Sequence, residues 1–230
     1  MLHSVQSKHR NRILAGLSAN DSETFFPDLK RVELEKGKVL FEPGEPGKYI
    51  YFPTTAVVSF SGGTGDGGSV EVWAVGWEGV AGISAMLGKT KPFRGVVQVA
   101  GDALMAKTSS CRRHFQKCDT FHYAVFNYYH QLMVQISYLG ICNNRHNIEQ
   151  RFSRWLLMLH DRVRSSELEF TQDAIASILG TRRATISVAA ATLQNAGVIS
   201  YSPGQITIES RRELQRAACG CYKIISAAGK

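Results

Sequence analysis

The sequence lacks any apolar run that approaches the roughly 20 residues needed to cross a bilayer. Its first residues, MLHSVQSK, also lack the apolar core of a signal peptide. We therefore expect a cytoplasmic protein without membrane contact. A disulfide framework is missing as well, because the cysteines form an odd count without scaffold or zinc-ribbon spacing, which is typical of a reducing compartment. The cysteines are Cys111, Cys118, Cys142, Cys219 and Cys221.

Sequence patterns of common enzyme sites are also absent. Residues 31 to 107 contain no histidine, so a cupin-like site of histidines and carboxylates cannot be assembled there. Neither a nucleophile-elbow pattern nor a phosphate-loop pattern occurs in the chain. We therefore expect a protein that is not an enzyme.

Positive charge is present in excess. The chain has 27 Lys and Arg residues against 19 Asp and Glu residues, which gives a formal net charge of +8. Residues 1–145 carry 16 basic against 12 acidic side chains, and residues 146–230 carry 11 against 7, so each part carries +4. The shorter C-terminal part is the more densely basic. This balance favours a polyanionic partner, because neutralised phosphates release counterions.

Residues 30 to 107 read as many short strands separated by glycine-rich turns, at residues 42–47 and 62–68 among others. This pattern indicates a sandwich or barrel. After Cys111 the pattern changes to a heptad-like spacing that predicts a long helix over about residues 113–143. We predict that its seam pairs with a second copy of the chain, while Phe126, Met133 and Tyr138 pack on the barrel. The seam residues are Val125, Tyr129, Leu132, Ile136 and Leu139.

The apolar spacing breaks at residues 143–147, which we interpret as a hinge between two domains, residues 1–145 and 146–230. Asn147 is predicted to cap the next helix, with Gln150 three residues further on.

Residues 171–197 predict two short helices joined by a turn at Gly180, which is a helix-turn-helix pattern. No carboxylate occurs from residue 174 to residue 200, and two arginines begin the second helix. The next residues predict a hairpin with its turn at 202–204, so the motif is winged. The alternative is an ordinary helical hairpin with solvated arginines. The predicted DNA contacts are Gln172, Thr181, Arg182, Arg183, Thr185 and Ser187.

This order of elements resembles the Crp/Fnr superfamily of bacterial transcription regulators, related to the cyclic-AMP receptor protein. The resemblance rests on the helix-turn-helix and on residues 40–47 (LFEPGEPG), 51–53 (YFP), 75–82 (VGWEGVAG) and 93–100 (FRGVVQVA). It implies an α+β fold with an N-terminal β-roll, which is a jelly roll like cyclic-nucleotide-binding domains, a long dimerisation helix and a C-terminal winged helix-turn-helix.

The resemblance also implies a function. The protein is expected to be a homodimer that binds a palindromic operator in double-stranded DNA and is controlled by a small-molecule effector at the β-roll. RNA polymerase is a candidate partner. Arg183 stands where family members commonly place the arginine that reads guanine. The alternative is a ligand-independent regulator whose β-roll is a degenerate module for dimerisation and protein contacts.

The sensor residues depart from those of cyclic-AMP binders. In such proteins a loop carboxylate, an Arg-Ser pair and a Thr-Ser pair hold the nucleotide; the matching positions here are Val80, Arg94 with Gly95, and Ile136 with Ser137. Three partners are missing, which argues against cyclic AMP. The region that would hold an effector comprises Glu78, Gly79, Val80, Arg94, Gly95, Ile136 and Ser137.

Other cofactors find little support in the sequence. Redox members of the family carry closely spaced N-terminal cysteines, and no cysteine precedes Cys111, which argues against an iron-sulfur cluster. Cys219 and Cys221 form a CxC pair that is compatible with redox or metal chemistry, although two thiols without such a role are the simpler interpretation.

Overall fold

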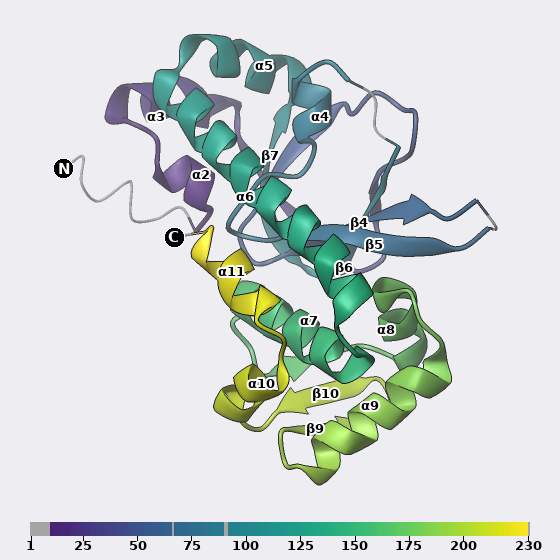
Figure 1. Cartoon of the computed structure of the whole chain (residues 1–230). Helices are drawn as coiled ribbons and strands as arrows, with labels where there is room; N and C mark the ends of the chain where they lie inside the picture. Colours follow the sequence, from purple (N-terminus) through teal and green to yellow (C-terminus); the bar gives the residue numbers. More distant parts are fainter. Residues whose placement is uncertain (1–9, 66, 90–91, 230) are drawn as a thin grey trace. The chain divides into compact units, whose positions relative to one another are not determined.

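The structure is a computed structural model that describes residues 10–65, 67–89 and 92–229. The first nine residues, which include the segment MLHSVQSK, lie outside the described part. The fold class predicted from the sequence is confirmed: a set of β-strands comes first, then a long helix and a C-terminal helix-turn-helix (Figure 1). No helix in the described ranges has both the length and the apolar character to span a membrane.

The chain divides into two compact units. The first consists of Met1–Gly62 and Trp73–Leu132, and the second of Gly63–Val72 and Met133–Lys230. The long helix α6 (Asp119–Arg145) contributes its first half to the first unit and its second half to the second unit.

Seven strands of the described chain form two antiparallel sheets. All of their residues belong to the first unit except those from Gly63 to Val72. One sheet has the order β1-β7-β3 and the other the order β2-β6-β4-β5. The strands are β1 (Lys30–Leu34), β2 (Val39–Phe41), β3 (Tyr49–Pro53), β4 (Val57–Gly63), β5 (Ser69–Val75), β6 (Arg94–Val99) and β7 (Gly101–Lys107). Leu34 and Ala103 of the first sheet share one core cluster with Val97 of the second, so the two sheets pack face to face.

Short helical elements surround these sheets: α2 (Arg12–Ala15), α3 (Ala19–Phe25), the 3-10 helix η1 (Phe26–Asp28), α4 (Ile83–Met86) and α5 (Thr108–Lys117). The N-terminal half of α6 covers the first sheet through Phe121. The Phe121 ring lies 6.1 Å from the ring of Phe52 on β3 and 4.8 Å from that of Phe25 on α3, measured between centroids. The predicted single helix over residues 113–143 is therefore wrong at its start, because Cys118 has extended backbone angles (φ −110°, ψ 103°) and separates α5 from α6.

The second unit contains α7 (Ile148–Val163), α8 (Gln172–Leu179), α9 (Arg183–Asn195), α10 (Arg211–Ala217) and α11 (Cys221–Ala227). A small sheet accompanies them, with β8 (Glu167–Leu168), β9 (Ile199–Ser202) and β10 (Gln205–Ile208) in the order β8-β10-β9. The predicted cap of α7 is confirmed, because the side chain of Asn147 accepts a hydrogen bond of 2.9 Å from the backbone N–H of Gln150.

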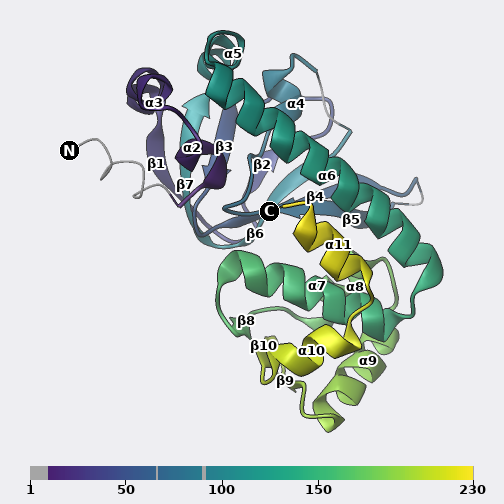
Figure 2. The ribbon, with the colours of Figure 1, turned by 60° about the vertical axis from the view of Figure 1, so that its left-hand side comes forward.

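Helices α10 and α11 lie along α7 (Figure 2). A polar network fixes them there. The guanidinium of Arg211 and the hydroxyl of Tyr222 both donate hydrogen bonds to the carboxylate of Asp161 on α7, at 2.8 and 2.7 Å. The C-terminal helices are thus an integral part of this unit.

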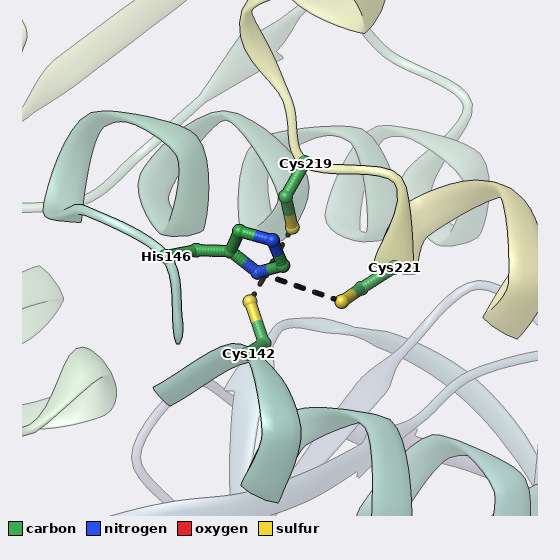
Figure 3. A group of neighbouring side chains, drawn as sticks. All are labelled: Cys142, His146, Cys219 and Cys221. Atoms are coloured by element: carbon green, nitrogen blue, oxygen red, sulfur yellow. Dashed lines mark hydrogen bonds between the residues drawn. The ribbon is translucent and has the colours of Figure 1, made fainter. Parts of the chain in front are cut away.

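Four side chains with soft or borderline donor atoms converge where α6 ends and α11 begins (Figure 3). Cys142 lies near the end of α6 and His146 directly after it, and Cys219 and Cys221 flank Gly220 at the start of α11. All four donor atoms lie within 4.8 Å of one another. The five cysteines of the chain are buried and free of disulfide bonds.

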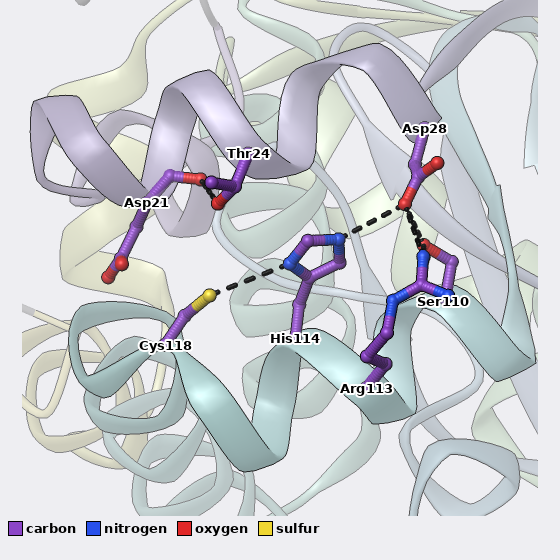
Figure 4. A network of polar contacts seen from close by, with 7 residues as sticks. All are labelled: Asp21, Thr24, Asp28, Ser110, Arg113, His114 and Cys118. Atoms are coloured by element: carbon purple, nitrogen blue, oxygen red, sulfur yellow. Dashed lines mark hydrogen bonds and ion pairs between the residues drawn. The ribbon is translucent and has the colours of Figure 1, made fainter.

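A second polar network joins the N-terminal helices to α5 within the first unit (Figure 4). The carboxylate of Asp28 accepts hydrogen bonds from Ser110 and from His114 Nε2, the latter at 3.0 Å, and forms an ion pair with Arg113. The Ser110 and His114 hydrogen bonds lower the pKa of Asp28, and the charge of Arg113 lowers it further. The Asp28 carboxylate therefore holds η1 against α5.

We expect Asp28→Asn to destabilise the protein at neutral pH by an amount that shrinks in acid. A carboxyl group with a lowered folded-state pKa contributes stability above its ordinary pKa of about 3.9, and this contribution is lost as the pH falls through the folded-state value. The check is urea unfolding of both proteins between pH 7 and pH 3.

Glu23→Gln, which removes an exposed acid on α3 outside the network, is the matched control and is expected to follow the wild type at every pH. A stability difference between Asp28→Asn and the wild type that stays constant down to pH 3 would contradict the assignment.

Candidate nucleic-acid interface and effector region

The two helices of the predicted helix-turn-helix form as the sequence indicates. α8 begins after Thr171, whose hydroxyl accepts a hydrogen bond of 3.2 Å from the backbone N–H of Ala174. The helix ends at Gly180, whose left-handed backbone (φ +60°) few other residues adopt without strain. The N–H of Thr181 then donates to the carbonyl of Ala176 at 2.9 Å, which closes the turn.

The apolar face of α9 decides which of its residues point outward. Ile186, Ala189, Ala190 and Leu193 are all buried. The start of the helix is different in character, because its N-cap residue Arg182 makes no side-chain capping bond and the first turn carries no acid. A helix N-terminus with free N–H groups and cationic side chains suits a phosphate-bearing partner.

The predicted DNA contacts cluster at this end of the motif. Arg182, Arg183 and Ser187 are exposed, whereas Thr181 and Thr185 are half-buried. Gln172 is half-buried and is the first residue of α8. The positions are thus compatible with the predicted roles, and the roles themselves stay a prediction.

Asp173 is a neighbour of Arg183 that the sequence reading missed. Its carboxylate lies 3.6 Å from Nε of Arg183, and both side chains are about two-thirds exposed (69% and 68%). Asp173 lies one residue before the acid-free stretch, which begins at 174, and ten residues before Arg183. Nothing in the local sequence pattern places the two side chains together. An exposed pair of this kind is typically worth about 0–1 kcal/mol. It therefore holds Arg183 only weakly and leaves the guanidinium free to exchange partners.

The wing forms as predicted. β9 and β10 pair in antiparallel register, with Ser202 opposite Gln205, and Gly204 supplies the positive φ of +83° that the turn requires. Ser200 donates a hydrogen bond of 2.7 Å to Glu209, and the ring of Tyr201 is half-buried. A phosphate that bound Ser200 would compete with the Glu209 carboxylate.

The glycine-rich loop of the first unit is packed tightly. Val80 is 2% exposed, and a Cβ atom at Gly79 would lie 2.1 Å from the ring of Tyr128 on α6. The buried amide of Asn11 donates to the carbonyl of Gly79 at 2.7 Å and holds the loop from its other side. The half-buried Glu78 uses its carboxylate to accept the N–H of Gly76 at 3.2 Å. These contacts bind the loop to its own unit.

Aromatic side chains occupy the space beside Gly95. A Cβ atom at position 95 would lie 2.6 Å from the ring of Phe41 and 2.9 Å from that of Phe60. The Phe60 ring stacks on Trp73 with centroids 4.6 Å apart, and Trp73 meets Phe93 edge-on at 4.8 Å. We call these four rings the aromatic ladder. It leaves no room for the serine that cyclic-AMP binders place at position 95.

The other predicted effector residues are divided between the two units. Arg94 is exposed, and its Nε lies 3.3 Å from a carboxylate oxygen of Glu42. Ile136 and Ser137 belong to the second unit, where Ile136 is half-buried and Ser137 is exposed. The sequence already lacks hydrogen-bond partners for cyclic AMP. The structure adds a second point, the close contact of Phe41 and Phe60 with Gly95.

The faces of α6 correct the predicted dimer seam. Val125 and Leu132, expected at the dimer interface, are 2% and 7% exposed and pack inward, because the helix uses that side to cover its own core. Phe126 and Met133, expected to pack on the barrel, are instead 54% and 48% exposed. Tyr129 at 44% is exposed as an interface residue should be, and Ile136 and Leu139 are half-buried.

A Cys–His–Asp arrangement in the first unit superficially matches a nucleophilic site. Sγ of Cys118 lies 3.5 Å from Nδ1 of His114, whose Nε2 contacts Asp28 (Figure 4). However, both Cys118 and His114 are 7% exposed, and burial raises the pKa of Cys118. A buried thiol with a raised pKa is a poor nucleophile, because the thiolate is the reactive form. The geometry therefore assigns these residues to packing and polar satisfaction.

Comparisons with known proteins agree with this architecture. Residues 150–217 match the Crp-like helix-turn-helix domain family. Curated protein sequences give no match. Among solved structures, a Crp/Fnr-family transcriptional regulator from Eubacterium rectale is similar over 91% of this chain and 99% of its own, with 15% identity and a TM-score of 0.66.

Two further structures show the same fold. FixK2 from Bradyrhizobium japonicum has a TM-score of 0.71 at 16% identity, covering 84% of this chain and 98% of its own. The c-di-GMP-responsive regulator CLP from Xanthomonas campestris has a TM-score of 0.65 at 14% identity, covering 84% and 100%.

Residues 150–217 therefore belong to the Crp-like helix-turn-helix domain family, and the chain as a whole has the fold of these regulator structures, with a β-roll, a long helix and a helix-turn-helix. The resemblance seen in the sequence is confirmed for this domain and for the fold.

Two groups of residues in the structure were not connected by sequence reasoning. The Asp28 network was missed because Asp28 lies more than 80 residues before its partners and no motif connects them. The convergence of Cys142 and His146 with the CxC pair was missed as well. The four-residue spacing of Cys142 and His146, which places both on one side of a helix, was the available signal.

We expect Gly95→Ser to destabilise the fold by about 1–3 kcal/mol, the usual cost of overpacking a core. Phe41→Leu makes room beside position 95, so the double variant is expected to lose less stability than the sum of the single changes. Urea unfolding of the four proteins measures this coupling.

Gly63→Ser is the matched control for this cycle. Gly63 is also a strand glycine, but a Cβ atom added there would have its nearest neighbour 4.0 Å away, so the substitution is expected to be nearly neutral. Strict additivity of the Gly95 and Phe41 substitutions would show that the two positions do not compete for space.

Proposed function

We propose that this protein is a homodimeric, sequence-specific transcription regulator that acts in the cytoplasm on a palindromic operator and responds to a signal at its β-roll other than cyclic AMP. The observation that carries the proposal is the start of α9. Its first turn is free of acids and exposes Arg182 and Arg183 within a Crp-like helix-turn-helix domain. Such an end suits the major groove, where arginine pairs with the O6 and N7 acceptors of guanine.

Different roles follow for the residues around this end. Arg183 is the candidate for base readout, since its planar fork can bind guanine with two hydrogen bonds and the competing Asp173 contact is solvent-exposed. Arg182, Thr181, Thr185, Ser187 and Gln172 are candidates for phosphate and base-edge contacts. Val188 is 65% exposed on the same helix and offers an apolar surface that suits a thymine methyl group.

A two-fold dimer places two recognition helices on half-sites about one helical turn apart, roughly 34–36 Å. The exposed apolar side chains of α6 support dimerisation. They are Tyr123, Phe126, Tyr129, Met133 and Ile141. Large apolar groups that remain exposed along one helix are typical of a surface that a partner covers.

The signal at the β-roll is the less constrained part of the proposal. The aromatic ladder and the Gly95 contact with Phe41 oppose a cyclic nucleotide held as in cyclic-AMP binders. CLP, which shares the fold, responds to c-di-GMP, so a different nucleotide is one candidate class. The same tight packing favours a second candidate function, a ligand-independent regulator whose β-roll serves dimerisation and protein contacts. The two differ in whether any small molecule raises the melting temperature of the protein.

We expect selection from a random duplex library to recover one palindrome, and Arg183→Ala to relax the choice at one base pair of each half-site. Loss of two hydrogen bonds to guanine costs about 1–3 kcal/mol of discrimination per site. The measurement is sequencing of the duplexes bound at moderate salt by each protein.

Arg182→Ala is the matched control, since it removes the neighbouring arginine. It is expected to weaken binding to all sequences alike and to reduce the salt slope by about 1 for each lost phosphate contact. Unchanged base preference in Arg183→Ala would remove the readout role, and salt-sensitive binding without any motif would count against the regulator itself.

We expect Phe126→Glu to convert a dimer into monomers, because it places a charge on the exposed apolar face of α6. Light scattering coupled to size-exclusion chromatography reports the mass. The control is Leu87→Glu, which changes an apolar side chain of similar exposure (48%) that lies off α6 and should leave the dimer intact. A monomeric wild type, or a dimeric Phe126→Glu, would contradict the proposed interface.

A further inference from the structure

The cluster of Cys142, His146, Cys219 and Cys221 has the dimensions of a tetrahedral metal site. Sγ of Cys142 lies 3.4 Å from Sγ of Cys219, and Sγ of Cys221 lies 3.6 Å from Nδ1 of His146. With Zn–S bonds of about 2.3 Å and Zn–N bonds of about 2.05 Å, a regular tetrahedron separates two sulfurs by about 3.8 Å and a sulfur from a nitrogen by about 3.6 Å. The observed sulfur–nitrogen separation equals its edge, the sulfur–sulfur separation of 3.4 Å is shorter than its edge, and all four donor atoms lie within 4.8 Å of one another.

The backbone presents these donors as two short chelating pairs. Cys142 and His146 are four residues apart, and the backbone N–H of His146 still donates to the carbonyl of Cys142 at 3.0 Å, so both lie on the same side of one helical turn. Cys219 and Cys221 flank Gly220, whose Cβ position has no neighbour within 4 Å. The close-up view shows the four side chains directed at a common centre (Figure 3). Two pairs from distant segments are typical of structural zinc sites.

Burial favours a coordinated role for the three thiols. Cys142, Cys219 and Cys221 are 0%, 4% and 4% exposed, and Tyr138 and Ile225 pack against them. Cysteine donors shielded from solvent in this way suit a coordinated ion, which they bind as thiolates.

The buried charge beside the cluster gives an independent argument. Arg154 of α7 is 3% exposed; its Nη1 donates to Sδ of Met158 at 3.2 Å, and its buried Nε has no hydrogen-bond partner within the described residues. No carboxylate of the described chain forms an ion pair with it. A buried guanidinium is costly unless a negative charge compensates it.

The thiol cluster is the compensating group that the structure offers. The positive charges of Arg154 and Arg151 both act on Cys142. Three thiolates and one imidazole around a divalent cation carry a net charge of −1, which offsets part of this positive charge. The electrostatics of the site therefore fit the metal-bound form better than three neutral thiols.

We propose that Cys142, His146, Cys219 and Cys221 bind one divalent metal ion of the zinc class, which joins the end of α6 to the start of α11. Sulfur and imidazole nitrogen together select zinc-like ions over magnesium or calcium. The short separations favour a single ion over an iron-sulfur cluster, because a cluster places several iron atoms between its thiolate ligands. On binding, each thiol that is still protonated releases its proton to solvent.

The site lies at the predicted hinge. The segment from residue 143 to residue 147 connects α6 to α7, and α11 returns to this point at the end of the chain. The ion would close a loop between residues 142 and 221 that contains the whole helix-turn-helix. Metal binding is thus expected to raise the melting temperature of the folded protein.

The test uses the full-length protein, reduced and stripped with a chelator, then loaded with Zn2+ or Co2+. We expect one equivalent of tightly bound zinc per chain by elemental analysis. Co2+ is expected to give the intense visible bands of a tetrahedral ion and thiolate-to-cobalt charge-transfer absorption. The cobalt spectrum is measured on the unmodified protein, so it does not depend on how any variant folds.

Cys142→Ser and Cys221→Ser are expected to lose the stoichiometric zinc and at least tenfold in affinity against a chromophoric competitor. The matched control is Cys118→Ser. Cys118 is also buried and also has a histidine four residues away at 3.5 Å, but no second pair of thiols faces it, so this variant should keep its zinc.

Three results would overturn the proposal: retention of one zinc equivalent by both cysteine variants, a cobalt spectrum of octahedral type, or iron with acid-labile sulfide in place of zinc in protein prepared without oxygen. None of these measurements involves DNA binding. They therefore test the metal site independently of the regulator function.

Discussion

Burial of one face of α9 is the constraint on which the proposed DNA-binding surface depends. Ile186, Ala189, Ala190 and Leu193 enter the core of the second unit, and this packing fixes the rotation of the helix. Small residues at 189 and 190 allow a close approach to the neighbouring helices. Once that face is inside, Ala184, Ser187 and Val188 lie on the outer side of the helix. Arg182 and Arg183 are exposed because they stand at the start of the helix, before its first buried residue, Ile186.

Tight packing at two glycines distinguishes the first unit. The β-roll keeps the architecture that the resemblance implies, but Phe41 and Phe60 pack on Gly95 and Tyr128 packs on Gly79. Aromatic rings at these distances exclude both a side chain and a ligand atom from the same volume. Near these glycines, the absence of hydrogen-bond partners and the presence of apolar packing both argue against cyclic AMP. The proposal of a signal other than cyclic AMP rests on these two observations.

Polar groups at the start and the end of the chain hold the terminal elements in their own units. Asp28 ties η1 to α5, and Asp161 ties α10 and α11 to α7 through Arg211 and Tyr222. The proposed metal site would add a second attachment of α11, to the end of α6. A dimer interface on α6 would precede the short segment of residues 143–147, and the unit with the helix-turn-helix would follow it. A metal ion at this place would join the end of α6 to α11 within the unit that holds the helix-turn-helix.

The sequence by itself determined the fold class, the strand set, the cap at Asn147 and the helix-turn-helix with its wing, because these follow from local periodicity, turn glycines and capping residues. It also indicated that cyclic AMP lacks its partners. Only the tertiary structure decided which face of α6 is exposed, since Val125 and Phe126 are both apolar and a heptad pattern does not say which side meets the core. It alone brought Asp173 to Arg183, and Cys142 and His146 to Cys219 and Cys221. Such contacts join residues that are distant in the chain, and their geometry depends on how whole helices pack rather than on any local spacing.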